Sequence, residues 1–135
     1  MKKIIIILLL MILLTGCINK KDGDKDMYII VNDIKYDVDL ANNKTVEKLY
    51  EILPLKYEMD ELNGNEKYVY IDYELPSNPA SVDRIEKGDI MLYGDNCLVL
   101  FYKSFTTTYS YTKIGHINNL EDLGSESITI RLEKK

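Results

Sequence analysis

From Ile90 to Tyr102 the chain reads IMLYGDNCLVLFY. Two short apolar runs that end in aromatic residues flank Gly94-Asp95-Asn96, a combination typical of a tight turn between strands. Cys97 opens the second run, where it is best interpreted as a small buried hydrophobic side chain. The stretch therefore predicts a β-hairpin.

Strand patterns continue on both sides of this hairpin. β-Branched and aromatic residues from Met27 to Val31, the turn at Asn32-Asp33 and the alternating residues 34–40 predict a second hairpin. Apolar alternation and turn residues predict further strands at 55–59, 68–73, 109–117 and 128–132.

One segment has the period of a helix. Apolar residues recur at three- and four-residue spacing between Asn43 and Pro54, which predicts an amphipathic helix that ends at the proline. Its apolar face is made of Val46, Leu49, Ile52 and Leu53. Residues 119–123 are expected to form a single helical turn before the last strand.

The fold class that follows is mainly β. About seven or eight short strands in a chain of this size are most economically closed into a barrel, because closure removes exposed strand edges. The main helix would cover one open end with its apolar face. A β-sandwich is the alternative.

Five segments, taken in chain order, carry a resemblance to a known family. They are Leu53-Pro54-Leu55, Asn63 to Lys67, Gly88 to Tyr93, Leu98 to Tyr102 and Tyr109 to Gly115. From Ile34 to Leu132 the chain resembles the small bacterial cyclophilin-like proteins. The resemblance implies a closed β-barrel capped by helices, and it implies a fold more strongly than an activity.

Peptidyl-prolyl isomerisation is the activity that a likeness to cyclophilins suggests. True cyclophilins share a Phe-His-Arg strand, whose arginine polarises the prolyl amide and eases a rotation with a barrier of about 18–20 kcal/mol. Here the strand from Leu55 to Met59 has neither arginine nor histidine, and Arg84 and Arg131 match no position of that motif. The sequence therefore favours a protein that is not an enzyme. A weak or divergent prolyl isomerase is the alternative.

The favoured function is a binding module whose barrel mouth takes a peptide or small ligand. The chain has 11 tyrosines and no tryptophan, and tyrosine offers a large contact area with one polar group. The hydroxyl-rich residues 105–108 are expected to border the pocket. For any single tyrosine, half-buried packing along a strand is the competing interpretation. The ligand-binding candidates are Phe101, Tyr102, Tyr109, Tyr111, Glu66 and His116.

Metal, cofactor and catalytic roles find little support. His116 is the only histidine, and Cys97 would be the one thiol left unmodified, whereas a zinc site needs three or four converging ligands. Ser104 and Ser110 lack the glycine-flanked turn of a hydrolase nucleophile. The acidic pairs at 60–61 and 121–122 are typical of solvated element ends. No metal, cofactor or catalytic residue is predicted.

The N-terminus predicts where the protein resides. Lys2 and Lys3 precede an apolar run from Ile4 to Leu14, and residues 14–17 read LTGC, which resembles a bacterial lipobox. Residues 1–16 are therefore predicted to be a lipoprotein signal peptide, with Cys17 as the lipidated residue. A transmembrane anchor is the weaker alternative, because eleven residues span roughly 16 Å of a hydrocarbon core about 30 Å thick.

Residues 17–26 would then form the lipidated cysteine and a flexible polar tether, and 27–135 the barrel domain. Cleavage leaves 119 residues, one domain's length, with a net charge of about −7. This charge argues against nucleic acid as a partner. The expected protein is a monomeric domain held at the extracytoplasmic face of the cell membrane by its acyl chains.

Overall fold

The computed structural model describes residues 25–135, which form a closed antiparallel barrel of eight strands with one helix. The predicted signal peptide, Cys17 and most of the predicted tether lie outside the described residues. The barrel strands are β1 (Met27–Val31), β2 (Ile34–Leu40), β3 (Leu55–Leu62), β4 (Glu66–Tyr70), β7 (Asp89–Tyr93), β8 (Cys97–Phe101), β10 (Ser110–His116) and β11 (Ile128–Lys134). The helix is α1 (Lys44–Glu51), and three short strands are β5 (Ala80–Ser81), β6 (Arg84–Ile85) and β9 (Phe105–Thr106).

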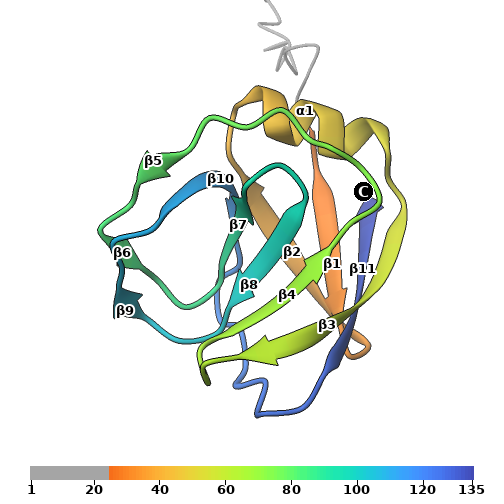
Figure 1. Cartoon of the computed structure of the whole chain (residues 1–135). Helices are drawn as coiled ribbons and strands as arrows, with labels where there is room; N and C mark the ends of the chain where they lie inside the picture. Colours follow the sequence, from red (N-terminus) through yellow and green to blue (C-terminus); the bar gives the residue numbers. More distant parts are fainter. Residues whose placement is uncertain (1–24) are drawn as a thin grey trace, which may run out of the picture.

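The barrel closes between strands far apart in the sequence (Figure 1). The order around it is β2-β1-β11-β3-β4-β8-β7-β10, and β10 returns to β2 through the pairs Gly115 with Leu40 and His116 with Asp39. Outside the barrel, β5 pairs with β10, and β6 pairs with β9. The predicted mainly β, closed barrel is confirmed, and the sandwich alternative is wrong.

The β7–β8 hairpin is buried on both faces, which explains why its sequence is apolar without alternation. Ile90 and Leu100 are register partners and face the barrel interior, whereas the neighbouring partners Met91 and Val99 belong to a second apolar cluster on the outer face. A strand that is covered on both faces contains a continuous apolar run. This hairpin is therefore shared between two cores.

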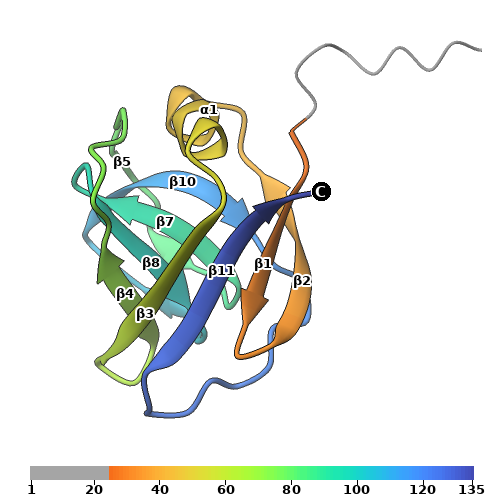
Figure 2. The ribbon, with the colours of Figure 1, turned by 90° about the vertical axis from the view of Figure 1, so that its right-hand side faces the viewer.

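Helix α1 covers one end of the barrel (Figure 2). Its N-cap is Asn43, whose side-chain oxygen accepts a hydrogen bond of 2.9 Å from the backbone N–H of Val46. This bond satisfies one of the free donors at the helix start. Val46 and Leu49 are buried in the main core, so the predicted amphipathic face is the one that seals the barrel.

A polar network closes the opposite end, beneath the segment between β10 and β11. Lys67 is fully buried, and its Nζ donates to the carbonyl oxygens of Gly124 at 2.7 Å and Glu126 at 2.6 Å. It also pairs with Glu61 Oε2 at 2.5 Å, while the Tyr102 hydroxyl donates to Glu61 Oε1 at 2.7 Å. Burial acts to raise the pKa of Glu61, but the hydrogen bonds from Lys67 and Tyr102 leave it below 4.5.

One part of the predicted fold is wrong. The expected helical turn at residues 119–123 does not form, because Asn119 has a φ of 59°, which a right-handed helical turn cannot continue. Leu120 is buried in the main core, so this segment serves as a loop tied to the barrel by one side chain. Among the helices of residues 25–135, none has the length and apolar content needed to cross a bilayer.

Candidate functional site

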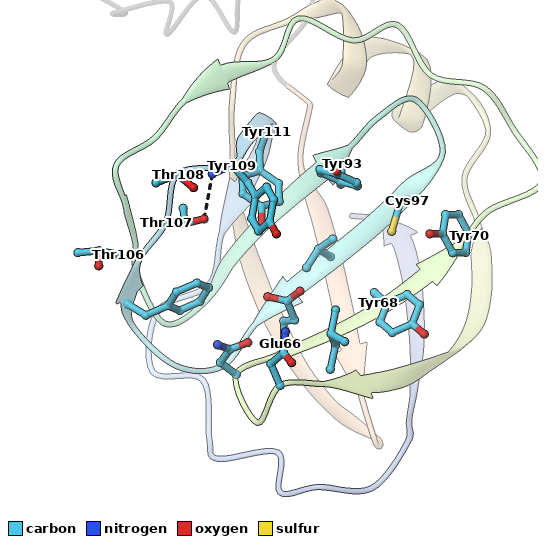
Figure 3. Close-up of a pocket in the computed structure, with 15 residues that line it drawn as sticks. Glu66, Tyr68, Tyr70, Tyr93, Cys97, Thr106, Thr107, Thr108, Tyr109 and Tyr111 are labelled. Atoms are coloured by element: carbon cyan, nitrogen blue, oxygen red, sulfur yellow. Dashed lines mark hydrogen bonds between the residues drawn. The ribbon is translucent and has the colours of Figure 1, made fainter.

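The candidate site lies on the outer face of one barrel wall, formed by β4, β8, β7 and β10 (Figure 3). Side chains that point outward from these strands form the second apolar cluster, which includes Met91, Val99 and Phe101. The segment around β9 rises at one side of the wall and contributes Phe105 to the cluster. Between them is a pocket of about 700 Å³, a size that suits a small molecule or a short peptide segment.

Aromatic rings and hydroxyl groups dominate the pocket. Among residues 25–135 its lining includes five tyrosines, three consecutive threonines and a single acidic side chain. The lining residues are Leu62, Asn63, Asn65, Glu66, Tyr68, Tyr70, Tyr93, Cys97, Val99, Phe105, Thr106, Thr107, Thr108, Tyr109 and Tyr111.

The tyrosines form two groups on opposite sides of the pocket (Figure 3). Tyr93 contacts Tyr109 with ring centroids 6.2 Å apart and planes at 78°, and Tyr111 at 5.8 Å and 55°. On the β4 side, Tyr68 and Tyr70 pack edge to face at 6.1 Å and 81°. Steeply inclined rings in each group present both faces and edges to the space between them.

Glu66 occupies the middle of this arrangement. It lies on the same face of β4 as Tyr68 and Tyr70, and its carboxylate points toward the centre of the pocket. Within residues 25–135 this carboxylate forms neither an ion pair nor a hydrogen bond, and partial burial together with the nearby charge of Glu61 raises its pKa above 4.5. A half-buried carboxylate without a partner can accept a positively charged or hydrogen-bonding ligand.

Two further titratable groups of the pocket have raised pKa values. Burial, reinforced by the charge of Glu66, raises the pKa of the Cys97 thiol to about 11 and that of the Tyr111 hydroxyl to about 12. Cys97 is therefore a protonated, weakly nucleophilic thiol at neutral pH. No lysine, arginine or histidine of the described residues lines the pocket.

Asn65 adds an unmet hydrogen-bond acceptor to the lining. Its side-chain Oδ1 is buried and has no partner within residues 25–135. An unsatisfied buried acceptor costs about 1–3 kcal/mol, so native proteins rarely keep one without a reason. A ligand with N–H or O–H donors would satisfy it.

The structure separates the six candidates predicted from the sequence. Glu66, Tyr109 and Tyr111 line the pocket together with threonines 106–108. Phe101 lies in the apolar cluster beneath, fully buried, with its ring centroid 5.5 Å from that of Tyr111. It supports the pocket without reaching its surface.

Tyr102 and His116 lie outside the pocket lining. Tyr102 is buried in the polar network that closes the barrel end, where burial and then Glu61 raise the pKa of its hydroxyl to about 12. His116 Nδ1 lies 2.8 Å from Asp89 Oδ1 at the β10–β7 pairing. Both open ends of the barrel are covered, so the pocket lies on the outer wall and not at the barrel mouth as the sequence predicted.

Tyr68, Tyr70, Tyr93 and Asn65 are pocket residues that sequence reasoning missed. A signal for two of them was present, because Glu66, Tyr68 and Tyr70 alternate along one strand and must share a face. Tyr93 and Cys97 are register partners at the two ends of the β7–β8 turn. Their place beside Glu66 depends on the pairing of β4 with β8, which no local pattern specifies.

Other sites find no support in the described residues. Within residues 25–135, no group of three or more histidine, cysteine, aspartate or glutamate side chains could hold a metal ion. Arg84 pairs with Glu86 on the exposed β6 side at 2.7 Å, and Arg131 lies in a separate hollow beside Lys56. Neither arginine lines the tyrosine pocket.

These features define a class of protein: a small closed β-barrel that carries a ligand-sized pocket on its outer wall. Over residues 29–133 the chain matches the model of the Cyclophilin-like family, and it belongs to that family. The resemblance expected from the sequence is thereby confirmed. Searches of curated proteins and of solved structures found no match.

Proposed function

We propose that this protein is a lipid-anchored extracytoplasmic binding protein, whose cyclophilin-like domain captures a small molecule or peptide segment in the tyrosine pocket. The observation that carries the proposal is the exposure of the pocket's aromatic rings. Tyr70, Tyr93 and Tyr109 are 63%, 47% and 62% exposed, although large apolar side chains elsewhere in residues 25–135 are mostly buried. Clustered exposed apolar groups beside a concave pocket are typical of binding sites.

The position of the pocket is compatible with an anchored domain. The LTGC sequence at residues 14–17 supports lipidation at Cys17, and the polar residues up to Asp26 support a short tether. The barrel begins at Met27, at the end covered by α1, and β11 ends beside it (Figure 2). A tether that joins the end of the barrel leaves the side wall, and therefore the pocket, open to a ligand.

Prolyl isomerisation is the weaker alternative. Of the residues that line the pocket within 25–135, none is an arginine, lysine or histidine, so no cation is positioned to polarise a prolyl amide. We therefore expect no catalysed isomerisation of a proline-containing peptide. A clear catalysed rate that disappears when Tyr109 is changed to Ala would reverse this assignment.

A ligand screen tests the binding function. The full chain, purified in a nonionic detergent, is screened by thermal shift against a library of short peptides and metabolites. Compounds that stabilise the protein should lose most of this effect in Tyr93→Ala and Tyr109→Ala. The matched control is Tyr73→Ala, because Tyr73 is an exposed tyrosine outside the pocket lining. Compounds that stabilise all three variants equally would place binding elsewhere and contradict the proposal.

A further inference from the structure

We infer that the pocket selects organic cations, and that its ligand carries a substituted ammonium group held between the tyrosine rings and the Glu66 carboxylate. This inference deepens the proposed function and rests on it. The ligand chemistry is shared by free quaternary or primary amines and by a lysine side chain of a peptide.

The charge of the lining indicates that the ligand is positively charged. Glu66 is the one charged residue among the lining residues of the described segment, and no cation within residues 25–135 pairs with it. The chain as a whole has a formal net charge of −5, which also favours the approach of a cation. An anionic ligand would meet an unpaired carboxylate with no positive group to compensate it.

The rings supply the second half of the recognition. A cation over a tyrosine face is attracted by the quadrupole of the ring, and clusters of steeply inclined aromatic rings are the usual receptors for substituted ammonium groups. Tyr93, Tyr109 and Tyr111 lie on one side of Glu66, and Tyr68 and Tyr70 lie on the other (Figure 3). A cation bound between the two groups would face aromatic rings and the carboxylate.

Lysine side chains of this protein lie over tyrosine rings elsewhere in residues 25–135, but none of them occupies this pocket. At the closed barrel end, the Lys67 ammonium lies 4.9 Å from the Tyr102 ring centroid and pairs with the Glu61 carboxylate. Elsewhere in residues 25–135, lysines lie over the rings of Tyr28 and Tyr50, but none lies over a tyrosine of the pocket. The pocket thus repeats the carboxylate and tyrosine of the internal site without its ammonium group.

Hydrogen-bond acceptors could refine the choice among cations. Asn65 contributes the unpartnered Oδ1, and the threonine hydroxyls at 106–108 can accept as well as donate. A primary ammonium group would use these acceptors through its N–H donors, whereas a quaternary group would rely on the rings and Glu66. The two sources of the ligand are therefore distinguishable by experiment.

Calorimetric titration of the full chain in a nonionic detergent tests the inference with three probes. Choline is the quaternary cation, Nα-acetyl-lysine amide is the peptide-like primary cation, and 3,3-dimethyl-1-butanol is the neutral isostere of choline. At least one cation should bind about tenfold more tightly than the neutral alcohol, the size of effect that cation–π and charge terms produce. The tighter of the two cations identifies the source.

Matched variants locate the effect. Glu66→Gln keeps the shape of the side chain and should weaken binding of the preferred cation about tenfold. Glu58→Gln makes the same change on an exposed part of β3, outside the pocket lining, and should leave the affinity unchanged. Far-ultraviolet circular dichroism of both variants verifies that they remain folded.

The outcomes separate this inference from the proposed function. If neither cation binds more tightly than the neutral alcohol, or if Glu66→Gln retains full affinity for the preferred cation, the cation inference is overturned. If neutral compounds from the thermal-shift screen bind in the pocket while cations do not, the binding function stands and only the cation selectivity fails. If no compound and no cation binds, both fail.

Discussion

Glu66 and Lys67 are neighbours in the sequence but serve different parts of the molecule. Because side chains alternate along a strand, Lys67 faces the barrel interior and Glu66 faces the outer pocket. Lys67 has three hydrogen-bond partners, and the Glu66 carboxylate has none within the described residues. A sequence cannot say which of two adjacent charges is buried, since the pairing of β4 with β3 and β8 decides it.

The first prediction concerns the buried Lys67–Glu61 pair. Glu61→Gln removes the countercharge of a fully buried ammonium group and should lower the free energy of unfolding by about 1.5–3 kcal/mol. Chemical denaturation of the full chain in a nonionic detergent measures the change. The control Glu58→Gln, an exposed carboxylate on the same strand, should change it by less than about 0.5 kcal/mol. Equal effects of the two variants would contradict the role assigned to the pair.

The same pair predicts a dependence of stability on pH. The pKa of Glu61 is lowered from 4.5, so its ionised form stabilises the folded state above that pH, and this contribution is lost as pH falls through the folded-state pKa. The raised pKa of Glu66 acts in the opposite direction. Its burial is common to both proteins, whereas the part due to the Glu61 charge is lost in Glu61→Gln and makes a smaller, opposing contribution to the difference.

The stability gap between the parent and Glu61→Gln should therefore narrow as the pH is lowered below 4.5. Denaturation curves collected at a series of pH values measure the gap. A gap that stays constant from neutral to acidic pH would show that the Glu61 charge does not contribute.

At the scale of single elements, the sequence predicts those whose residues carry their own signal. The β7–β8 hairpin and α1 form where apolar runs, turn residues and helical spacing indicate them. The two-residue strands β5, β6 and β9 were not predicted, because their pairing depends on partners distant in the chain. The strand predicted at 68–73 is β4 at Glu66–Tyr70, since its pairing with β3 and β8 sets its limits.

The next prediction concerns the pairing of β10 with β2, which closes the barrel. A Cβ atom at Gly115 would lie 2.7 Å from Val38 Cγ1 and 2.8 Å from the backbone oxygen of Asp39, both too close for a stable contact. Gly115→Ala must therefore shift the strands that close the barrel, at a cost of about 1–3 kcal/mol. Thermal unfolding measures this loss. Lys113→Ala, an exposed change on the same strand, is the control and should be nearly neutral.

For the whole molecule, the decisive feature is that both barrel ends are covered while one outer wall is hollowed. The sequence predicts a barrel and names Glu66, Tyr109 and Tyr111, but it assigns them to the barrel mouth. It predicts that the helix covers one end, but it cannot show that the β10–β11 segment closes the other, because that covering arises from contacts distant in the chain. The pocket proposed to bind a ligand lies on the outer wall, which is not covered.

Lipid anchoring is a prediction about the whole chain. In a bacterial host the parent protein should fractionate with membranes and gain the mass of its acyl chains. Cys17→Ser removes the thiol that is alkylated, so it should abolish the mass shift. Mass spectrometry of the two fractions measures the change. Persistence of the mass shift in Cys17→Ser would contradict the lipoprotein assignment.

We propose that the outer-wall pocket, and not the barrel interior, binds the ligand. The most direct test of this proposal is an NMR chemical-shift map of the full chain, in nonionic detergent, with the best ligand from the screen. The largest changes should fall on Glu66, Tyr93 and Tyr109, with little change at the buried end residues Lys67 and Tyr102. Changes concentrated at Lys67 and Tyr102, with Glu66 and Tyr109 unaffected, would contradict it.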